Sequence, residues 1–466
     1  MKKRLFAIAL LTVGVLSLNT SCSDDFVDRK FYQNTEQAPL TNYQEIQAFL
    51  RGALVSMRSS TYYGCDFLAY GEIRSDKMYS NKRSGYYTTV QDYSMLSNDS
   101  YASGTWNQIY TMVAKTNIVI NTNVDSFSGT PDDLVRSRFI QGQAYALRAQ
   151  GFFDLLRLYG QKYTGGNLGV VLPLEYNPKA KMPRATIAET EAQIEADFNK
   201  AIQVMTTNVA GDDTSTVSGK TDVSLNAVKG LMSRFYLYKG DYAKVRQLTN
   251  EIVASNKYKV VDTSNLVDSF KFIFNAAASN SIFELAVGQV SALGTTSYSY
   301  KINPSGYSNI QMKAGAFAGL YTANDVRRGL VSTRTTSPAG QYVTGKYTEV
   351  GTGKDDIRIL RYEEILLNGA EAELNGGDAT KALAYYNQVI TNRGLAAATS
   401  VTLDEVKLER VKEFLGEGLR QWDLLRWGDT SFKPATVNVQ KLAFPIPRAE
   451  TDIAGSLIQS NPGYDN

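Results

Sequence analysis

Histidine is absent from the whole sequence of 466 residues, and this absence excludes several kinds of chemistry. Hydrolases with a Ser-His-Asp or Cys-His arrangement need a histidine base, and many zinc sites need histidine ligands. A mechanism that uses only a pair of carboxyl groups, as in many glycosidases, needs neither. An enzyme of that last class therefore remains open as an alternative.

Cysteine is almost absent as well, with Cys22 and Cys65 as the two in the chain. If Cys22 carries a lipid, as the N-terminal pattern below indicates, Cys65 is the one free thiol of the mature protein. No disulfide within the chain is then available, so we expect the hydrophobic core to stabilise the fold without covalent cross-links.

The sequence also lacks an excess of charge of either sign. It has 49 basic and 46 acidic residues, and Lys2, Lys3 and Arg4 are the charged residues among the first 21. Without these three, 46 basic residues remain, which equals the number of acidic residues. Proteins that bind nucleic acid usually carry a basic surface and a high isoelectric point. We therefore expect no nucleic-acid partner.

The N-terminus resembles the export signal of a bacterial lipoprotein. The uncharged run from Leu5 to Leu18 follows a basic start, and it is shorter than the about 20 apolar residues that span a bilayer. A small residue then precedes Cys22, as in a lipobox, although Asn19 stands where an aliphatic residue is usual. We expect residues 1–21 to be a signal peptide and Cys22 to be lipidated. An ordinary signal peptide, cleaved without lipidation, is the alternative.

The residues directly after Cys22 are Ser23-Asp24-Asp25. This triplet resembles the acidic signal that sends lipoproteins of the Bacteroidetes to the outer face of the outer membrane. We therefore expect a lipid-anchored protein that faces the cell exterior. A plain polar tether is the other interpretation of the same residues.

Apolar residues at helical spacing predict a mostly α-helical protein. Thr186 and Glu189 form a capping-box pattern, and Lys239-Gly240-Asp241 indicates the end of one helix and the start of the next. Residues 60–104 and 261–356 show no lasting period and many turn residues, so we expect loops there. The expected helices cover residues 43–57, 106–117, 132–160, 186–205, 224–238, 241–255, 361–374, 379–391 and 403–427, the last with a break near Gly416–Gly418.

The expected helices form pairs at 224–257 and 361–393. Each pair spans about 34 residues, the length of a tetratricopeptide unit. No long linker or low-complexity run divides the chain. We therefore predict one mostly α body, a tetratricopeptide-like scaffold of helical pairs with a loop-rich, irregular ligand-binding part.

A set of short motifs is spread over nearly the whole chain after the signal. They are WNQIY (106–110) with Asn117, RAQGFFDLLRLYG (148–160), IRILRYEEILLNGAEAE (357–373), the stretch 409–427, FPIP (444–447) and NPGY (461–464). Together and in this order, these segments resemble the SusD/RagB family. Small departures are Ser460, where glutamine often precedes NPGY, and Val411-Lys412, in a run that is usually richer in Glu and Arg.

The resemblance implies a protein without enzymatic activity that binds a nutrient at the cell surface. It would pass a glycan, or as an alternative a peptide in the manner of RagB, to a SusC-like TonB-dependent transporter in the outer membrane. It also implies an N-terminal SusD-like part over 22–220 and a C-terminal SusD/RagB part over 221–466. We expect no cofactor; acidic pairs such as Asp212-Asp213 are too common to decide whether calcium binds.

Family ligand sites lie in the loops before the helix that contains Trp106 and in the middle irregular region. Trp106, Trp422 and Trp427 all belong to framework motifs, so we expect them in the core and expect Tyr or Phe to supply any stacking surface. Arg and Asn can hydrogen-bond sugar hydroxyls or peptide carbonyls. The candidate ligand-binding residues are Asn81, Arg83, Tyr86, Tyr87, Tyr93, Tyr298, Tyr300 and Tyr307.

Other classes of protein make different demands on the sequence. A carboxylate-pair glycosidase needs two carboxyl groups in different environments across a cleft. Glu409, Glu413 and Glu417 instead follow a spacing of four, which favours a solvated or salt-bridged helix face. A purely structural tetratricopeptide scaffold would bind protein partners and no small ligand.

Overall fold

The computed structural model describes residues 38–209, 219–271 and 278–465, and contacts within the chain make Thr41–Asn466 one unit. The expected signal peptide, Cys22 and Asp212-Asp213 lie outside the described residues, so the expectations for them stay predictions. Among the described residues, no helix combines the length and the apolar character needed to cross a membrane.

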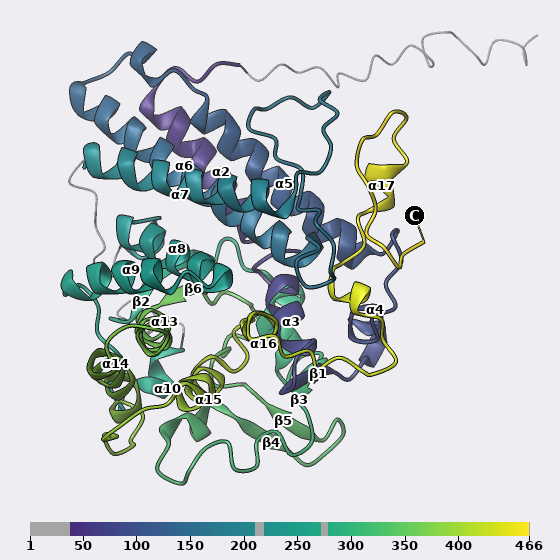
Figure 1. Cartoon of the computed structure of the whole chain (residues 1–466), viewed down its shortest axis with the longest axis vertical. Helices are drawn as coiled ribbons and strands as arrows, with labels where there is room; N and C mark the ends of the chain where they lie inside the picture. Colours follow the sequence, from purple (N-terminus) through teal and green to yellow (C-terminus); the bar gives the residue numbers. More distant parts are fainter. Residues whose placement is uncertain (1–37, 210–218, 272–277, 466) are drawn as a thin grey trace, which may run out of the picture. The chain divides into compact units, whose positions relative to one another are not determined.

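Long helices pack side by side in the first half of this unit (Figure 1). They are α2 (Tyr43–Met57), α5 (Ser100–Ile120), α6 (Pro131–Tyr159) and α7 (Ile187–Thr207). The side chains of Thr130 and Thr186 cap α6 and α7, and Asp133 and Glu189 complete the two capping boxes. The predicted capping box is therefore confirmed, and helix bounds agree with the prediction within a few residues except at the start of α5.

The tetratricopeptide-like part consists of helical pairs, as predicted. One pair is α8 (Leu225–Lys239) with α9 (Tyr242–Ala254), and another is α13 (Tyr362–Leu374) with α14 (Ala379–Thr391). Gly240 adopts φ +77° between α8 and α9, a left-handed conformation that glycine accepts without steric cost. The pairs pack on each other through α9 and α13, and α15 (Leu403–Phe414) packs on α13 (Figure 1).

The prediction of loops throughout residues 60–104 is wrong in part. This region contains α3 (Asp66–Ile73) and the short α4 (Thr88–Gln91), and α5 begins at Ser100 and not at Trp106. Every residue of α3 after Asp66 is buried, so the helix has no polar face. A helix that is buried all round has no solvent-facing polar stripe and so shows no clear period of 3.6, which is why the pattern did not reveal it.

The described residues of 261–356 are largely irregular, as expected, and each short strand described there pairs with one other strand. The ladders are antiparallel and join β1 (Met78–Ser80) to β3 (Ile310–Met312), β2 (Ser281–Leu285) to β6 (Ile357–Arg361), and β4 (Ser332–Arg334) to β5 (Gly340–Tyr342). The described residues also contain the short α-helices α10 (Leu266–Ser269), α12 (Tyr298–Ile302), α16 (Arg420–Arg426) and α17 (Arg448–Thr451), along with single 3-10 turns. The β1–β3 ladder brings the two loop-rich regions together.

The predicted helix over 403–427 is interrupted near Gly416–Gly418, as predicted. α15 ends at Phe414 and α16 begins at Arg420, with Gly416 and Gly418 at φ +82° and +78° between them. Glu417 lies in this turn, so the prediction that it shares a helix face with Glu409 and Glu413 is wrong.

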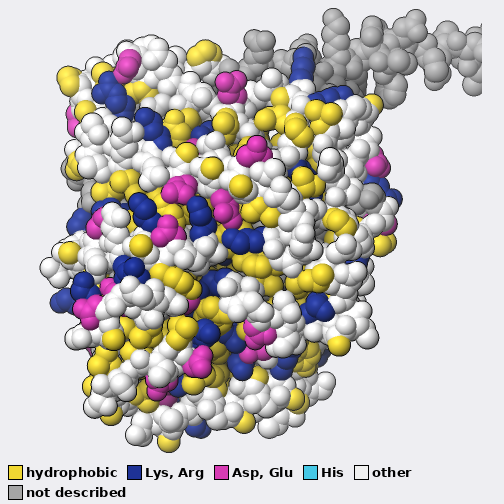
Figure 2. All heavy atoms as spheres, in the orientation of Figure 1, with side chains coloured by type: hydrophobic (Ala, Val, Ile, Leu, Met, Phe, Trp, Pro, Cys, Tyr) yellow, Lys and Arg dark blue, Asp and Glu magenta, His cyan; other side chains and the backbone are white. Residues whose placement is uncertain are grey.

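Glu409 and Glu413 are salt-bridged, as one interpretation predicted, but they are buried and not solvated. Arg327 contacts Glu409 at 2.5 Å and Glu413 at 3.1 Å. Arg361 and Arg393 contact Glu413 at 3.0 and 2.9 Å. We call these five residues the charge cluster. At the surface, by contrast, acidic and basic side chains are interspersed over the face in Figure 2.

The tryptophans only partly follow the expectation that all three lie in the core. Trp106 and Trp422 are buried. Trp427 is only partly buried, with its indole N–H donating to Glu371 at 3.0 Å and its ring against the Arg426 guanidinium. It therefore covers an ion-paired surface region and does not fill the core.

Candidate functional site

Two loops from distant parts of the sequence meet beyond the β1–β3 ladder. The ladder continues past Ser80, since the N–H of Asn81 donates to the carbonyl of Asn309 at 2.9 Å. The Asn81 side-chain amide donates to the carbonyl of Ser308 at 2.6 Å, and the Asn309 amide donates to the carbonyl of Arg83 at 2.8 Å. These bonds hold the loops 81–87 and 303–309 together, and they commit the Asn81 amide to that structural role.

The joined loops present a cluster of aromatic rings. The rings of Tyr86 and Tyr307 stack with centroids 5.2 Å apart, and Tyr300 meets Tyr307 edge-on at 4.8 Å. Tyr307 is exposed, and Tyr86 and Tyr300 are half-buried. None of the three hydroxyls has a hydrogen-bond partner within the described part of the chain. Flat rings with free hydroxyls suit a ligand that has an apolar face and polar edges.

Lys301 lies directly against these rings. It sits on α12, whose first turn is capped by the Ser297 side chain. Its ammonium nitrogen lies 3.4 Å from the centroid of Tyr86 and 4.4 Å from that of Tyr307, which are cation–π distances. Burial lowers the pKa of Lys301, and the nearby Cys65, Tyr307 and Asp66 oppose that shift.

Two arginines lie on or against the loops that carry the rings. Arg83 precedes Tyr86 by three residues, and its side chain is exposed. Arg334, on β4, donates to the carbonyl of Pro304 at 2.6 Å and so supports the turn that carries Tyr307. We call the assembled surface the tyrosine patch; it consists of Arg83, Tyr86, Tyr300, Lys301, Tyr307 and Arg334.

The backbone around the patch is strained. Lys82, Ser84, Tyr87 and Ser308 all have positive φ, between 52° and 60°, although none is glycine. Such conformations cost roughly 1–3 kcal/mol each and persist where the surrounding structure enforces them, often at functional sites. Their concentration in the two loops indicates that the arrangement of the patch is maintained against a local cost.

The other predicted candidates lie beneath the surface. Tyr87 is buried and its hydroxyl donates to Asp66 at 2.8 Å. Tyr93 is buried under the Arg74 guanidinium, and Tyr298 is buried with its ring edge-on to another tyrosine. The structure therefore brings Arg83, Tyr86, Tyr300 and Tyr307 together at one surface, with Asn81 behind them, and places these three tyrosines in the supporting core.

The sequence-based prediction missed Lys301, Asn309 and Arg334. Lys301 directly follows Tyr300, so a closer view of that segment could have included it. No pattern in the sequence distinguishes Asn309 or Arg334 from other polar loop residues, because their roles depend on the pairing of β1 with β3 and on the position of Pro304.

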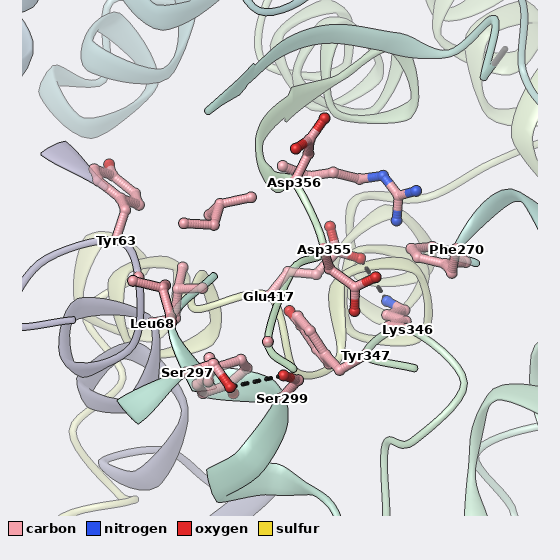
Figure 3. Close-up of a pocket in the computed structure, with 16 residues that line it drawn as sticks. Tyr63, Leu68, Phe270, Ser297, Ser299, Lys346, Tyr347, Asp355, Asp356 and Glu417 are labelled. Carbon is pink, nitrogen blue, oxygen red and sulfur yellow. Dashed lines mark hydrogen bonds and ion pairs between the residues drawn. The ribbon is translucent and has the colours of Figure 1, made fainter. Parts of the chain in front are cut away.

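A small pocket lined by both apolar and charged side chains lies elsewhere, between α3 and the loops around residues 297 and 355 (Figure 3). Figure 3 shows Lys346 pointing toward Glu417, which it contacts at 2.5 Å, and Asp355 nearby. Burial raises the pKa of Asp355 to about 6. The cavity has a volume of about 40 Å³, which is room for a few water molecules and not for a sugar ring.

A wider groove runs beside Trp106, between α5 and the segments 171–182 and 450–458. Its volume is about 500 Å³, which is large enough for a small ligand. Its polar groups are largely bonded within the protein, because Tyr110 bonds to both backbone groups of Val171 and Lys181 donates to the carbonyl of Ala454. We call it the Trp106 groove.

The glutamates of the charge cluster do not resemble an acid and a base. Burial disfavours ionisation, but Arg393, Arg361 and Arg327 together hold the pKa of Glu413 well below its usual value. Its carboxylate is therefore ionised and fully paired. A glycosidase would need a second carboxyl group with a raised pKa across an open cleft.

Two family models match this sequence. One is described as starch-binding and associating with the outer membrane and matches residues 25–237, and the SusD family model matches residues 319–441. The chain belongs to the SusD/RagB family. The resemblance predicted from the sequence motifs is thereby confirmed.

Relatives of known sequence or structure cover nearly the whole SusD/RagB chain. A SusD-like protein of Bacteroides ovatus is 24% identical over 92% of this chain and 83% of its own length. The crystal structure of a SusD superfamily protein from Bacteroides thetaiotaomicron is 25% identical, with a TM-score of 0.80, over 91% of this chain and all of that one. Surface glycan-binding protein A from the same organism, solved with laminarihexaose, is 19% identical with a TM-score of 0.70 over 90% of this chain and 99% of that one.

Proposed function

We propose that the protein binds a glycan at the tyrosine patch, on the outside of the cell, and passes it to a SusC-like TonB-dependent transporter. The observation that carries this proposal is the stacked, solvent-facing pair of Tyr86 and Tyr307 with their free hydroxyls. The flat face of a sugar ring packs on such rings while its hydroxyls hydrogen-bond at the edges.

The comparisons support a glycan as the class of ligand. One matching family model is named for starch binding, and a solved protein with the same fold holds laminarihexaose. The same model is named for association with the outer membrane, which agrees with the lipoprotein signal that we expect over residues 1–21, before Cys22. A lipid on Cys22 would hold the protein beside its transporter.

We further propose that the protein binds its ligand without chemical change. Histidine is absent from the sequence, and the carboxylates of the charge cluster are occupied by arginines. Delivery to a transporter needs only reversible binding, so a surface of rings and hydrogen-bonding groups is sufficient.

The proposal is tested by screening the purified protein against arrays of oligosaccharides and peptides, followed by a pull-down from native outer membranes in mild detergent. We expect binding of an intact oligosaccharide and co-purification of a TonB-dependent transporter. Binding of peptides alone would instead indicate a RagB-type peptide receptor. Release of shorter sugars would indicate a glycosidase, and capture of other proteins without a transporter or small ligand would indicate a scaffold.

A further inference from the structure

The tyrosine patch is far more basic than the chain as a whole. The three described segments that form it, 79–93, 298–311 and 332–342, contain Lys82, Arg83, Lys301 and Arg334 but only one acidic residue, Asp92. Asp92 contacts Lys82 at 2.5 Å, so that pair is neutral. Arg83, Lys301 and Arg334 then remain as positive charges around the rings, in a chain whose mature charges balance.

Among these cations, Lys301 gives the strongest indication of an anionic ligand, because it lacks an acceptor within the described part of the protein. It is only 5% exposed, yet its ammonium has no hydrogen-bond acceptor or ion-pair partner among the described residues. The carboxylate of Asp66, which lies below the patch, accepts its hydrogen bond from Tyr87 instead. The nitrogen atom itself is not fully buried, so it keeps contact with solvent and is open to an acceptor from a ligand. The rings of Tyr86 and Tyr307 offset its charge but leave its N–H donors without acceptors.

Arg83 repeats this pattern at the surface. Its guanidinium makes no hydrogen bond or ion pair with any described residue, although its backbone carbonyl is bonded to Asn309. Arg334 uses part of its donor set on Pro304 and Thr336. Guanidinium groups favour planar anionic partners such as carboxylates, and they bind sulfate and phosphate groups in a similar way.

The hydrogen-bonding capacity of the patch is therefore unbalanced toward donors. The Asn81 amide is occupied in joining the loops through both its nitrogen and its oxygen, and the Asn309 amide oxygen, although it has no hydrogen-bond partner among the described residues, is buried below the surface. The hydroxyl of a neutral sugar is both a donor and an acceptor, and a site for such sugars benefits from acceptor groups such as carboxylates. A donor-rich site instead matches a group that only accepts.

We propose that the tyrosine patch selects acidic oligosaccharides, in which a sugar ring stacks on Tyr86 or Tyr307 and its anionic substituent is bound by Lys301 and Arg83. The inference rests on the proposed function and narrows its ligand class. A uronic acid carboxylate and a sulfate ester share the required chemistry, since both are acceptor-only anions attached to a sugar ring.

The test measures binding of the full protein by titration calorimetry with matched probes. The probes are uronic acid oligosaccharides of two linkages, their methyl esters, a sulfated oligosaccharide, its desulfated form, and neutral laminarihexaose. We expect at least one acidic probe to bind roughly tenfold or more tightly than its neutral partner, because hydrogen bonds between charged groups are the stronger ones. That affinity should also fall as the salt concentration rises. The pair that shows the difference distinguishes a carboxylate from a sulfate.

Two variants locate the effect. Arg83→Gln changes an exposed side chain without protein partners, so we expect the variant to fold normally and to lose most of the preference for the acidic probe. Lys301→Met keeps the apolar stem and should remove the preference as well. The control Lys179→Gln, at an exposed lysine in segment 171–182, should leave binding unchanged.

The outcomes separate this inference from the proposed function. If a neutral oligosaccharide binds at the patch as tightly as every acidic probe, the preference for acids is overturned and glycan binding stands. A preference that survives both Arg83→Gln and Lys301→Met also overturns it. If no oligosaccharide of any charge binds, the proposed function itself is overturned.

Discussion

The ring of Tyr86 stacks on the ring of Tyr307 with an angle of 27° between their planes. Tyr86 follows β1 and Tyr307 precedes β3, so the pair exists because these strands form a ladder. The amides of Asn81 and Asn309 fasten the same two loops. The proposed ligand surface is thus held in place by contacts between the two halves of the chain before any ligand arrives, which lowers the entropic cost of binding.

Removing either ring of the pair should weaken glycan binding. We expect Tyr86→Ala and Tyr307→Ala each to lower the affinity about tenfold, because an aromatic contact of this kind contributes about 1 kcal/mol beyond the area that it buries. Tyr307→Phe should retain most of the affinity. Calorimetric titration with the best oligosaccharide from the array measures the effect.

The matched control is Tyr176→Ala, since Tyr176 is an exposed tyrosine that lines the Trp106 groove. It should bind glycan like the unchanged protein. The reverse result, with loss of binding in Tyr176→Ala and none in Tyr307→Ala, would place the ligand in the groove and not at the patch.

Breaking the charge cluster should destabilise the protein strongly. Arg393 is fully buried and contacts both Glu413 and Glu363. Arg393→Met would leave these carboxylates partly unpaired in the core, which costs roughly 3–5 kcal/mol of the free energy of unfolding. Urea denaturation followed by fluorescence measures the change.

A surface substitution on α15, the helix that carries Glu409 and Glu413, provides the comparison. Asp404 lies at the exposed start of α15, and Asp404→Asn should leave the urea midpoint nearly unchanged. If Arg393→Met shifted the midpoint no further than Asp404→Asn, the view that the cluster determines core stability would be wrong.

Glu72 should make stability depend on pH. It is buried on α3, and burial raises its pKa to about 8, although the N–H of Gly418 donates to it at 2.8 Å. At pH values between the usual pKa of a glutamate and about 8, Glu72 is ionised in the unfolded chain but still protonated in the folded protein. The contribution of Glu72 to stability is therefore full at low pH and is lost as pH rises through this window.

The variant Glu72→Gln retains an acceptor for Gly418 and cannot ionise. We expect its stability relative to the unchanged protein to rise between about pH 5 and pH 8, by on the order of a few kcal/mol, and then to level off. Melting temperatures of both proteins across this range test the sign. A difference that stays constant with pH would contradict the assignment.

Lipidation should depend on Cys22 alone. We expect Cys22→Ser to abolish incorporation of labelled fatty acid and to move the protein out of the outer-membrane fraction. Cys65 is buried, with its sulfur 3.2 Å from the Tyr87 hydroxyl, so Cys65→Ser should keep the label. Membrane attachment that persists in Cys22→Ser would favour an ordinary signal peptide and another means of attachment.

The bounds of regular helices and the positions of glycine turns could be predicted from local sequence patterns. The bounds of α2 and α14 agree with the predicted ranges, because each helix has one apolar and one polar face. The turn at Gly240 and the break at Gly416–Gly418 follow from the conformational freedom of glycine. The helix α3 escaped prediction because its buried surface surrounds it and leaves no period to detect.

The residues of the candidate site could be predicted from the sequence only in part. Tyrosines in loops predicted an aromatic binding surface. Tyr86 and Tyr87 were predicted for the same reason, but Tyr86 reaches the surface and Tyr87 is buried. The backbone turns at Tyr87, where φ is 55°, and this determines which of the neighbouring rings points inward. Which ring points inward therefore depends on packing against Asp66 and Tyr101 and not on local sequence.

By itself, the sequence determined the helical class, the paired helices, the absence of histidine chemistry and the family, because each of these follows from residue types and their spacing along one chain. Only the tertiary structure decided that Tyr86, Tyr307 and Lys301 share one surface and that Glu409 and Glu413 are buried ion pairs. The physical reason is that ring stacking, ion pairing and burial depend on distances between residues far apart in the chain, and these distances are set by the packing of the whole unit.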